Sequence, residues 1–369
     1  MRLRTLILGY TLGQLARLAS TEPIPEPSGE FNVGMRRFVV DFTNPDDPTS
    51  PNNVSTGYLA TIYYPTKDDP APPAPYLEPE LAQIYADVWD FDIAHLTTTM
   101  RWNASFLPGK HSAGPSLVFG PGGWGPPTDG FRILLSDLAS HGYTVAAIDH
   151  PHEQPFLRFP DGTGLVGLPV NYSSDLEFID AFHPVRVREM LHFVDYWPKL
   201  VKKLCAPFQT RKLGAFGVSF GGSVALNAAI ESDNTAAAIN LDGSIFGHAA
   251  ANLSSSDAKK PTLLLGFEGH VASLDESWNN FTSRQSDWWR GIYVDGTVHQ
   301  DWSDMSFWKI WGTTKELGPI DGRRMMDVRS TYTRAFFDEH LRGEESPLMD
   351  GPAEQWPEVV VDDGSDGGR

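Results

Sequence analysis

The stretch Leu213-Gly-Ala-Phe-Gly-Val-Ser-Phe-Gly-Gly-Ser-Val-Ala-Leu-Asn-Ala-Ala-Ile230 decides the fold. Its first residues, 213–216, are apolar and predict a short buried strand, whereas 221–230 read as a helix. The turn between them fits the pattern G-x-S-x-G, in which flanking glycines let the backbone pass closely and the serine takes a strained conformation. The pattern therefore predicts Ser219 as an exposed nucleophile at the start of a helix.

Segments on both sides of this stretch continue the same alternation. Short apolar runs predict strands, and amphipathic runs between them predict helices. The expected strands are 116–119, 143–148, 236–241, 262–265 and 291–294, and the expected helices are 131–140, 184–204 and 324–341. Two earlier strands, 31–42 and 58–64, form an antiparallel start. Alternation of this kind favours a mostly parallel sheet with helices on both faces, and with the serine turn it predicts an α/β-hydrolase fold.

Four segments are expected along the 369 residues. Residues 1–20, with two arginines before a short apolar run, resemble a secretory signal peptide. Residues 21–30 contain three prolines and predict an extended, solvated linker. Residues 31–349 are expected to form a single catalytic domain, and the acidic, glycine-rich residues 350–369 a disordered tail.

The charge balance limits the partners that can be expected. The chain carries 29 Lys and Arg against 47 Asp and Glu, a net charge of -18. So acidic a chain has no electrostatic reason to bind nucleic acid or an anionic membrane. No segment is long and apolar enough to span a bilayer. Cys205 is the single cysteine, which excludes an intrachain disulfide and a cysteine metal cage, and we expect neither metal nor cofactor.

Five sequons support the assignment of the N-terminal run as a signal. Each fits the pattern N-x-[ST] and is a candidate for N-glycosylation. The asparagines are Asn53, Asn103, Asn171, Asn252 and Asn280. The sequence therefore predicts a secreted glycoprotein.

A serine nucleophile needs a histidine to accept its proton and a carboxylate to orient that histidine. In this fold both follow the serine on loops after strands. Asp242 directly follows the strand 236–241, and His299 follows the strand 291–294. Spacing favours His299 over His248 and His270. It leaves Glu268, which follows the strand 262–265, open as the acid.

The oxyanion of an acyl-transfer intermediate needs preorganised N–H donors. One is the N–H of Phe220, the residue after the serine. The other is expected from the turn Gly120-Pro-Gly-Gly-Trp-Gly125, which follows a strand and precedes a helix. Together these groups predict an esterase that forms an acyl-enzyme on Ser219, with His299 as the general base.

Three short motifs go beyond the general fold. Gly217-Val-Ser-Phe-Gly-Gly222, Leu241-Asp-Gly243 and Val298-His-Gln300 resemble the plasma-type platelet-activating-factor acetylhydrolases. That family has a GHSFGG turn, a catalytic Asp in an LD dipeptide and a VHQ-type histidine loop. The resemblance extends over about residues 31–345, nearly all of the expected folded chain.

The resemblance implies a function and a site. It implies Ser219, Asp242 and His299 as the triad, which would exclude Glu268, and Phe220 and Gly123 as the oxyanion donors. It also implies a secreted, calcium-independent esterase that hydrolyses short-acyl esters such as the sn-2 acetyl group of 1-alkyl-2-acetylglycerophosphocholine. Small esters or phospholipids are then the expected partners, with contact at a lipid surface.

This chain departs from the family pattern near the site. Val218 replaces a histidine in the serine turn, and Gly120-Pro121 replaces the usual Ser-His, so substrate choice is expected to differ more than chemistry. The apolar stretch 81–106 either shapes the pocket or packs a core helix. The aromatic residues expected to line the pocket are Trp89, Trp124, Trp302 and Phe307.

Two alternatives remain. A broader carboxylesterase, lipase or polyester hydrolase would use the same triad in a more open cleft. A binding protein of the same fold would ordinarily lack the serine, the acid or the histidine, and all three are present here.

Overall fold

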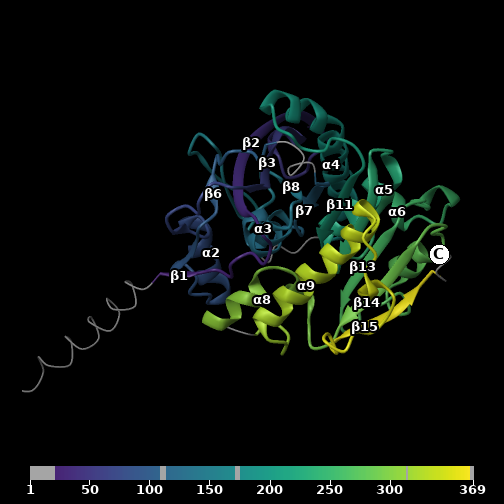
Figure 1. Ribbon diagram of the computed structural model, residues 1–369. Helices are drawn as coiled ribbons and strands as arrows, with labels where there is room; N and C mark the ends of the chain where they lie inside the picture. The colour runs from purple at the N-terminus through teal and green to yellow at the C-terminus, as the bar shows by residue number, and fades with distance from the viewer. Residues whose placement is uncertain (1–20, 109–113, 171–174, 313–314, 366–369) are drawn as a thin grey trace, which may run out of the picture.

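A ten-stranded sheet runs through the centre of the computed structural model, which describes residues 21–108, 114–170, 175–312 and 315–365 (Figure 1). In spatial order its strands are β15 (Val359–Gly364), β14 (Trp289–Val294), β13 (Thr262–Phe267), β12 (Thr235–Leu241), β11 (Leu213–Val218), β7 (Ser116–Gly120), β8 (Thr144–Asp149), β3 (Val54–Thr66), β2 (Asn32–Pro45) and β6 (Arg101–Trp102).

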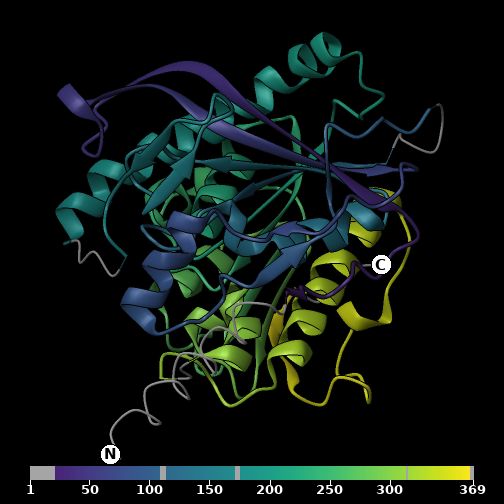
Figure 2. The same cartoon turned by 90° about the vertical axis from the view of Figure 1, so that its left-hand side faces the viewer.

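The middle of the sheet is parallel, and this positions the site. The six strands from β14 to β8 run parallel, whereas β15 and β3 join their neighbours antiparallel. The carboxyl ends of β7, β11, β12 and β14 therefore lie along one edge, where active sites of open α/β sheets form. At the far end β2 and β3 form a long antiparallel hairpin, visible in Figure 2.

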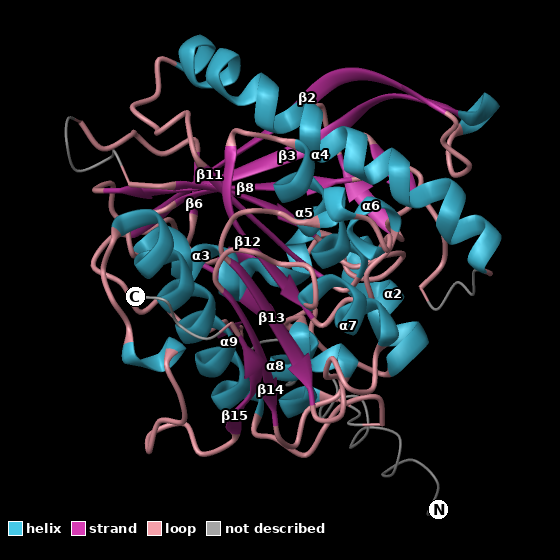
Figure 3. Cartoon of the chain, turned by 90° about the vertical axis from the view of Figure 1, so that its right-hand side faces the viewer, coloured by secondary structure: helices cyan, strands magenta, loops and turns pink. Residues whose placement is uncertain are grey.

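Helices cover both faces of the sheet (Figure 3). Successive strand residues face opposite sides, so Phe119 and Phe216 join one core, whereas Val118 and Ala215 join the other. One face carries α2 (Pro79–Trp89), α3 (Arg132–Ser140), α8 (Met305–Trp308) and α9 (Gly322–Phe337). The other carries α4 (Leu176–Leu204), α5 (Phe220–Glu231), α6 (Gly247–Ala250) and α7 (Glu276–Thr282).

This architecture confirms the predicted α/β fold and its order of strands and helices. Helix α4 starts earlier than predicted. It begins at Leu176 and continues through Pro184, where the sequence predicted its first turn. Asp175 caps the helix by accepting a hydrogen bond from the N–H of Phe178 at 2.9 Å. A side-chain cap of this kind satisfies a helix-terminal N–H that lacks an intrahelical partner.

The expected disorder of residues 350–369 is wrong for most of that segment. Val359–Gly364 form β15, which pairs antiparallel with β14 and closes that edge of the sheet. Trp356 and Val359 are buried. The acidic composition of the segment conceals three consecutive valines, of which Val359 and Val361 face the core from one side of the strand. Residues 366–369 lie outside the described part of the chain.

The expected linker at 21–30 is extended and largely exposed, but it is attached to the domain rather than free in solvent. Glu22–Pro23 form β1, which pairs with β5 (Leu96–Thr98), and Ile24 is buried. Further along, the N–H of Ser28 donates to Asp137 at 2.8 Å. The prolines tolerate this packing, since a peripheral strand needs few N–H donors.

The predicted signal peptide, residues 1–20, lies outside the described residues. In the part of the chain that the structure describes, no helix has the length and apolar composition to cross a membrane.

Candidate active site

Ser219 occupies the sharp turn between β11 and α5, with φ 55° and ψ -122°. Its N–H donates to the carbonyl of Leu241 on the neighbouring strand at 2.7 Å, which fixes the turn to the sheet. A Cβ at Gly221 would lie 2.1 Å from the carbonyl oxygen of Gly120. Only glycine fits there, and the close approach holds the serine in its strained conformation.

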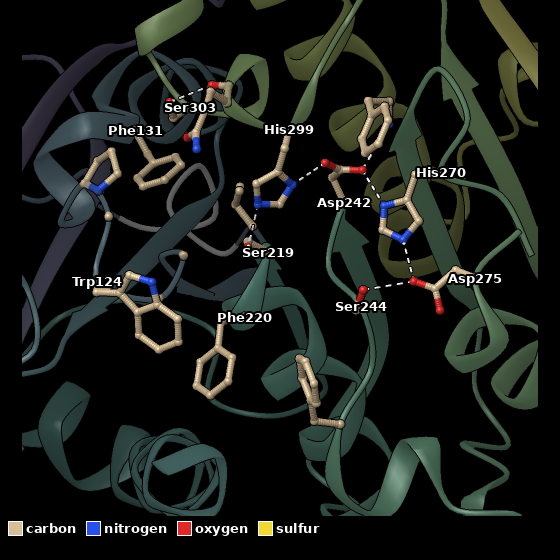
Figure 4. Close-up of a pocket in the computed structure, with 18 of the residues that line it drawn as sticks. Trp124, Phe131, Ser219, Phe220, Asp242, Ser244, His270, Asp275, His299 and Ser303 are labelled. Carbon is tan, nitrogen blue, oxygen red and sulfur yellow. Dashed lines mark hydrogen bonds and ion pairs between the residues drawn. The ribbon is translucent and has the colours of Figure 1, made fainter. Parts of the chain in front are cut away.

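Three predicted residues come together at this turn (Figure 4). The Nε2 of His299 lies 2.9 Å from the Oγ of Ser219, and its Nδ1 lies 2.5 Å from Oδ2 of Asp242. The side chain of Asp242 is fully buried, whereas that of His299 is 43% exposed. The arrangement can move a proton from the serine to an imidazole whose tautomer the aspartate fixes.

The other residues that the sequence left open lie elsewhere. Glu268 is exposed and accepts from the N–H of Gly296 at 3.1 Å, so its carboxylate holds the turn before His299 rather than the imidazole. His248 lies 3.0 Å from the Oγ of Ser255, away from the serine turn. Asp242 is therefore the carboxylate in contact with His299.

His270 has an unexpected position beside the same aspartate. Its Nδ1 lies 2.6 Å from Oδ1 of Asp242, and its Nε2 lies 3.0 Å from Oδ2 of Asp275. Burial opposes its positive charge, but the hydrogen bonds to the two carboxylates outweigh burial and raise the pKa of His270 to about 9. Asp242 thus contacts two imidazoles, one on each oxygen.

The glycine-rich turn after β7 lies over the serine turn. A Cβ at Gly122 would lie 3.5 Å from that of Ser219, and a Cβ at Gly123 would lie 3.4 Å from that of Phe220. Within the described residues, no hydrogen bond uses the N–H of Gly123 or Phe220. The two turns are thus in contact, which makes both N–H groups candidates for an oxyanion hole.

A buried ion pair holds this turn in place. Arg186 of α4 donates to the carbonyl of Pro121 at 2.6 Å and to that of Gly122 at 3.3 Å. Glu153 accepts from the N–H of Trp124 at 2.7 Å and from Arg186 at 3.3 Å. Both charged side chains are completely buried. The pair fixes carbonyls and an N–H of the turn, and so sets the direction of the peptide units between them.

A cavity of about 580 Å³ opens at Ser219. Its walls include Trp89 and Trp124, as predicted, and Val218. The ring of Trp124 packs 5.8 Å from that of Phe220, between centroids. Trp302 and Phe307 were expected in the cavity wall, but both are buried in the core, because the short helix that begins at His299 and α8 turn these side chains inward.

The cavity has two kinds of wall. One side is apolar and aromatic, with Trp124, Phe131, Ile179, Phe220 and Phe246. The other is polar, with Ser244, His270, Asp275, Gln300 and Ser303. Within the described ranges, no group of three or more His, Cys, Asp or Glu side chains could hold a metal ion.

Sequence reasoning did not assign roles to Glu153, Arg186 and Asp275, and it treated His270 only as a rival base. The sequence could have indicated that Arg186 is buried. It is a charged residue four positions from both Phe182 and Met190, on the apolar face of a helix. The contact of His270 with Asp242 carried no such indication, because it joins two loops that lie far apart in the sequence.

Comparisons with known proteins identify esterases among the relatives of this chain. The family model for "Platelet-activating factor acetylhydrolase, isoform II" matches residues 191–355. A "Probable 1-alkyl-2-acetylglycerophosphocholine esterase" of Arthroderma benhamiae is 26% identical, over 91% of this chain and 93% of that protein. The "Platelet-activating factor acetylhydrolase" of Canis lupus familiaris is 23% identical, over 86% of this chain and 77% of that protein.

A solved structure gives the same picture of the fold. The ferulic acid esterase from Streptomyces cinnamoneus has a TM-score of 0.77 and 27% identity, and the match covers 93% of this chain and 100% of that one. The fold, the serine turn and these relatives agree. This chain is similar to the platelet-activating factor acetylhydrolases and is a carboxylic ester hydrolase of the α/β-hydrolase fold.

Proposed function

We propose that this enzyme hydrolyses short-acyl esters, such as the sn-2 acetyl ester of 1-alkyl-2-acetylglycerophosphocholine, with Ser219, His299 and Asp242 as its catalytic triad. The observation that carries the proposal is the hydrogen-bonded row of these three side chains in one cavity. The names of the relatives supply the substrate class.

The chemistry follows from the geometry. The Oγ of Ser219 attacks the ester carbonyl carbon and passes its proton to Nε2 of His299, while Asp242 stabilises the imidazolium. The N–H groups of Phe220 and Gly123 stabilise the negative oxygen of the tetrahedral intermediate. The imidazolium then protonates the departing alcohol oxygen, which leaves an acyl-serine. Water, deprotonated by His299, attacks this acyl-serine and releases the acid.

The apolar wall supports a preference for short acyl groups. Trp124, Phe131 and Phe246 can contact the hydrocarbon of a substrate, but a cavity of about 580 Å³ is limited in length. Each additional methylene in an apolar pocket changes discrimination by only about 1 kcal/mol, so the preference is expected to be graded. Acetyl to butyryl esters are expected to be cleaved best.

A panel of p-nitrophenyl esters from acetyl to palmitoyl, together with 1-alkyl-2-acetylglycerophosphocholine, tests the substrate class. We expect a maximum of kcat/KM between acetyl and butyryl and release of acetate from the phospholipid. Trp89→Ala should change this chain-length profile more than it changes turnover of acetyl esters, since Trp89 lines the cavity. A flat profile up to palmitoyl would instead support the broader lipase reading.

A second candidate substrate class is esters of hydroxycinnamic acids. Two observations favour it, the similarity to the ferulic acid esterase and the aromatic side chains along the apolar wall. Methyl ferulate in the same panel distinguishes the two. A kcat/KM for methyl ferulate above that for the acetyl phospholipid would make this second class the preferred one.

The enzyme is further proposed to be secreted and N-glycosylated. Asn53, Asn103 and Asn252 are exposed, which supports their use as acceptors, and Asn280 is half-buried. Asn171 and the signal segment 1–20 lie outside the described residues. Secreted material should lose mass on treatment with an endoglycosidase. An unglycosylated protein that stays in the cell would contradict the proposal.

Contact with a lipid surface is proposed at the rim of the cavity. Leu274 lines the cavity and is 74% exposed, and Val88 beside Trp89 is also exposed. Cosedimentation with phosphatidylcholine vesicles should decrease for Leu274→Asp. Equal binding of the two proteins would exclude Leu274 from that contact.

A further inference from the structure

Five side chains form one continuous row through the site. From the outside inwards they are Asp275, His270, Asp242, His299 and Ser219, as Figure 4 shows. The inner three are the proposed triad. The outer two are used by no step of the proposed mechanism, yet they lie in the same cavity wall.

The outer end of the row is rigidly held. Asp275 caps α7, and its Oδ1 accepts from the N–H of Ser277 at 2.7 Å and from that of Trp278 at 3.2 Å. Its Oδ2 accepts from the hydroxyl of Ser244 at 2.9 Å and from His270. The imidazole of His270 also packs against the ring of Trp278 in a tilted arrangement, with centroids 4.2 Å apart. His270 therefore has little freedom to turn.

The partners of His270 determine its charge. Each ring nitrogen faces an oxygen of a carboxylate, and an ionised carboxylate can only accept a hydrogen bond. Both nitrogens must then carry hydrogens, which makes His270 an imidazolium. Because both N–H groups are already used, His270 has no donor left for a substrate. Its action must pass through Asp242.

We propose that His270 is a positioning residue of this esterase, an imidazolium anchored by Asp275 that fixes the side chain of Asp242 and offsets part of its negative charge. This inference rests on the proposed function, in which Asp242 orients His299. The N–H of Phe267 supports the same oxygen of Asp242 at 3.0 Å, so the carboxylate keeps one donor if the imidazolium is lost.

The groups around His270 agree with this assignment. The charged side chains that face it are Asp242, after β12, and Asp275, at the start of α7. Phe267 and Trp278 complete its surroundings with aromatic rings. The raised pKa of His270, about 9, means that the imidazolium persists through neutral pH.

The imidazolium of His270 offsets part of the negative charge of Asp242 on the side away from His299. Without this cation, Asp242 would attract the proton of His299 more strongly, and the acid limb of kcat/KM would move to higher pH. Two charges roughly 7 Å apart in an effective dielectric near 20 predict a shift of between about one and two pH units. The wild-type enzyme should also show an alkaline limb near pH 9, where His270 loses its proton.

The experiment measures kcat and KM for p-nitrophenyl acetate from pH 5 to 10 for the wild type, His270→Asn and His270→Leu. Asn keeps a neutral N–H donor within reach of Asp242, and Leu keeps none. We expect both variants to shift the acid limb upwards by between about one and two pH units. In both, the alkaline limb near pH 9 should disappear. The kcat of His270→Leu should fall at least tenfold and that of His270→Asn less, with KM little changed. A higher kcat in His270→Asn than in His270→Leu would show that the hydrogen bond to Asp242 matters, because a role in packing alone does not require an N–H donor.

A matched control is His248→Asn. His248 also lies beside a carboxylate, with its Nδ1 3.7 Å from Glu231, but it is remote from the triad. Its pH profile should overlay that of the wild type. If His270 variants fold poorly, Asp275→Asn keeps the helix cap, and Asn caps helices well. That variant removes one of the two carboxylates that hold the proton on His270, so it should move the alkaline limb below pH 9.

The result can separate this inference from the proposed function. Covalent labelling of Ser219 with a fluorophosphonate counts active sites, so rates are compared per folded enzyme. Activity that persists in Ser219→Ala would overturn the proposed function itself. Activity that requires Ser219, with His270→Asn and His270→Leu both matching the wild-type kcat and pH profile, would overturn only the role of His270. A neutral His270 at pH 7, seen by 15N NMR of labelled histidine, would do the same.

Discussion

Two places in this molecule bring together a serine, a histidine and a carboxylate. In one, His299 contacts Ser219 and Asp242. In the other, His248 lies 3.0 Å from the Oγ of Ser255 and 3.7 Å from Glu231. The residue types are the same, and the serine–histidine distances differ by only a tenth of an ångström.

The surroundings of the two groups differ. Asp242 is completely buried, whereas Glu231 is 36% exposed, so water weakens its hold on His248. Ser219 has a strained positive φ on a turn between two glycines, but Ser255 lies in an exposed short helix with an ordinary φ. Nothing corresponding to the oxyanion turn adjoins Ser255 in the contacts described for it. The comparison teaches that strain, burial and preorganised donors distinguish a catalytic triad from a surface hydrogen-bond chain.

Serine replacement should separate the two groups most strongly. Ser219→Ala is expected to lower kcat by about 10⁴- to 10⁶-fold, since the covalent path is lost and only binding and the oxyanion hole remain. Ser255→Ala should retain wild-type turnover. Hydrolysis of p-nitrophenyl acetate by both purified variants measures this. Comparable losses in the two would mean that the strained turn carries no special role.

Replacing the carboxylate of each group should also affect kcat very differently. Asp242→Asn is expected to cut kcat about 10³- to 10⁴-fold, because the amide favours the wrong tautomer of His299. Glu231→Gln and Glu268→Gln should stay within about twofold of the wild type, as neither carboxylate contacts His299. If Glu268→Gln were the most damaging of the three, the acid would have to be reassigned.

The ion pair under the oxyanion turn has no counterpart at the surface group. Arg186→Met should destabilise the fold by about 3–5 kcal/mol, because it leaves Glu153 buried without its partner. The double variant Arg186→Met/Glu153→Gln should recover much of that stability. Its kcat should stay about 10- to 100-fold low, since the turn lacks its anchor. Urea unfolding and steady-state kinetics measure the two effects.

Arg188 provides the control for this pair. It lies on the same helix but donates to Asn44 at 2.6 Å, on the side away from the site. Arg188→Met should leave kcat unchanged. A double variant that recovered both stability and full activity would show that the ion pair acts on folding alone.

The smallest expected effect concerns stability against pH. His270 has a pKa of about 9 in the folded protein, above the value of about 6.5 expected when unfolded. The contribution of His270 to the free energy of unfolding is therefore fully present below pH 6.5 and is lost as pH rises through 9. The loss amounts to roughly 3 kcal/mol. Urea unfolding at pH 6, 8 and 10 should show this decline in the wild type and in His248→Asn but not in His270→Asn.

Local patterns predicted the fold well, and long-range contacts limited the rest. The strand–turn–helix around Ser219 and the strands before Asp242 and His299 could be read from neighbouring residues, because local propensity agrees with the final fold. The ion pair of Arg186 with Glu153 joins a helix to a loop thirty-three residues away. His270 meets Asp242 from a different loop. A single sequence carries no signal for such long-range contacts.

Two errors had the same physical source. Composition suggested that 21–30 and the segment after 350 were solvated, yet Ile24 and Trp356 are buried against the domain. A few apolar residues at the right spacing outweigh many acidic or proline neighbours once a sheet offers an unpaired edge.

The strand β15 ties the end of the chain to the histidine loop. Just before it, the carbonyl of Glu358 accepts from the N–H of Asp295, at the turn that leads to His299, with 2.8 Å between the atoms. The preceding Glu354 and Gln355 are exposed and open to a protease. A cut there would free β15 and expose the edge of β14, which could then pair with a strand of another molecule. It would also loosen the turn that leads to the general base, His299. Inactivation and aggregation should then begin together, from a nick far from the serine in sequence.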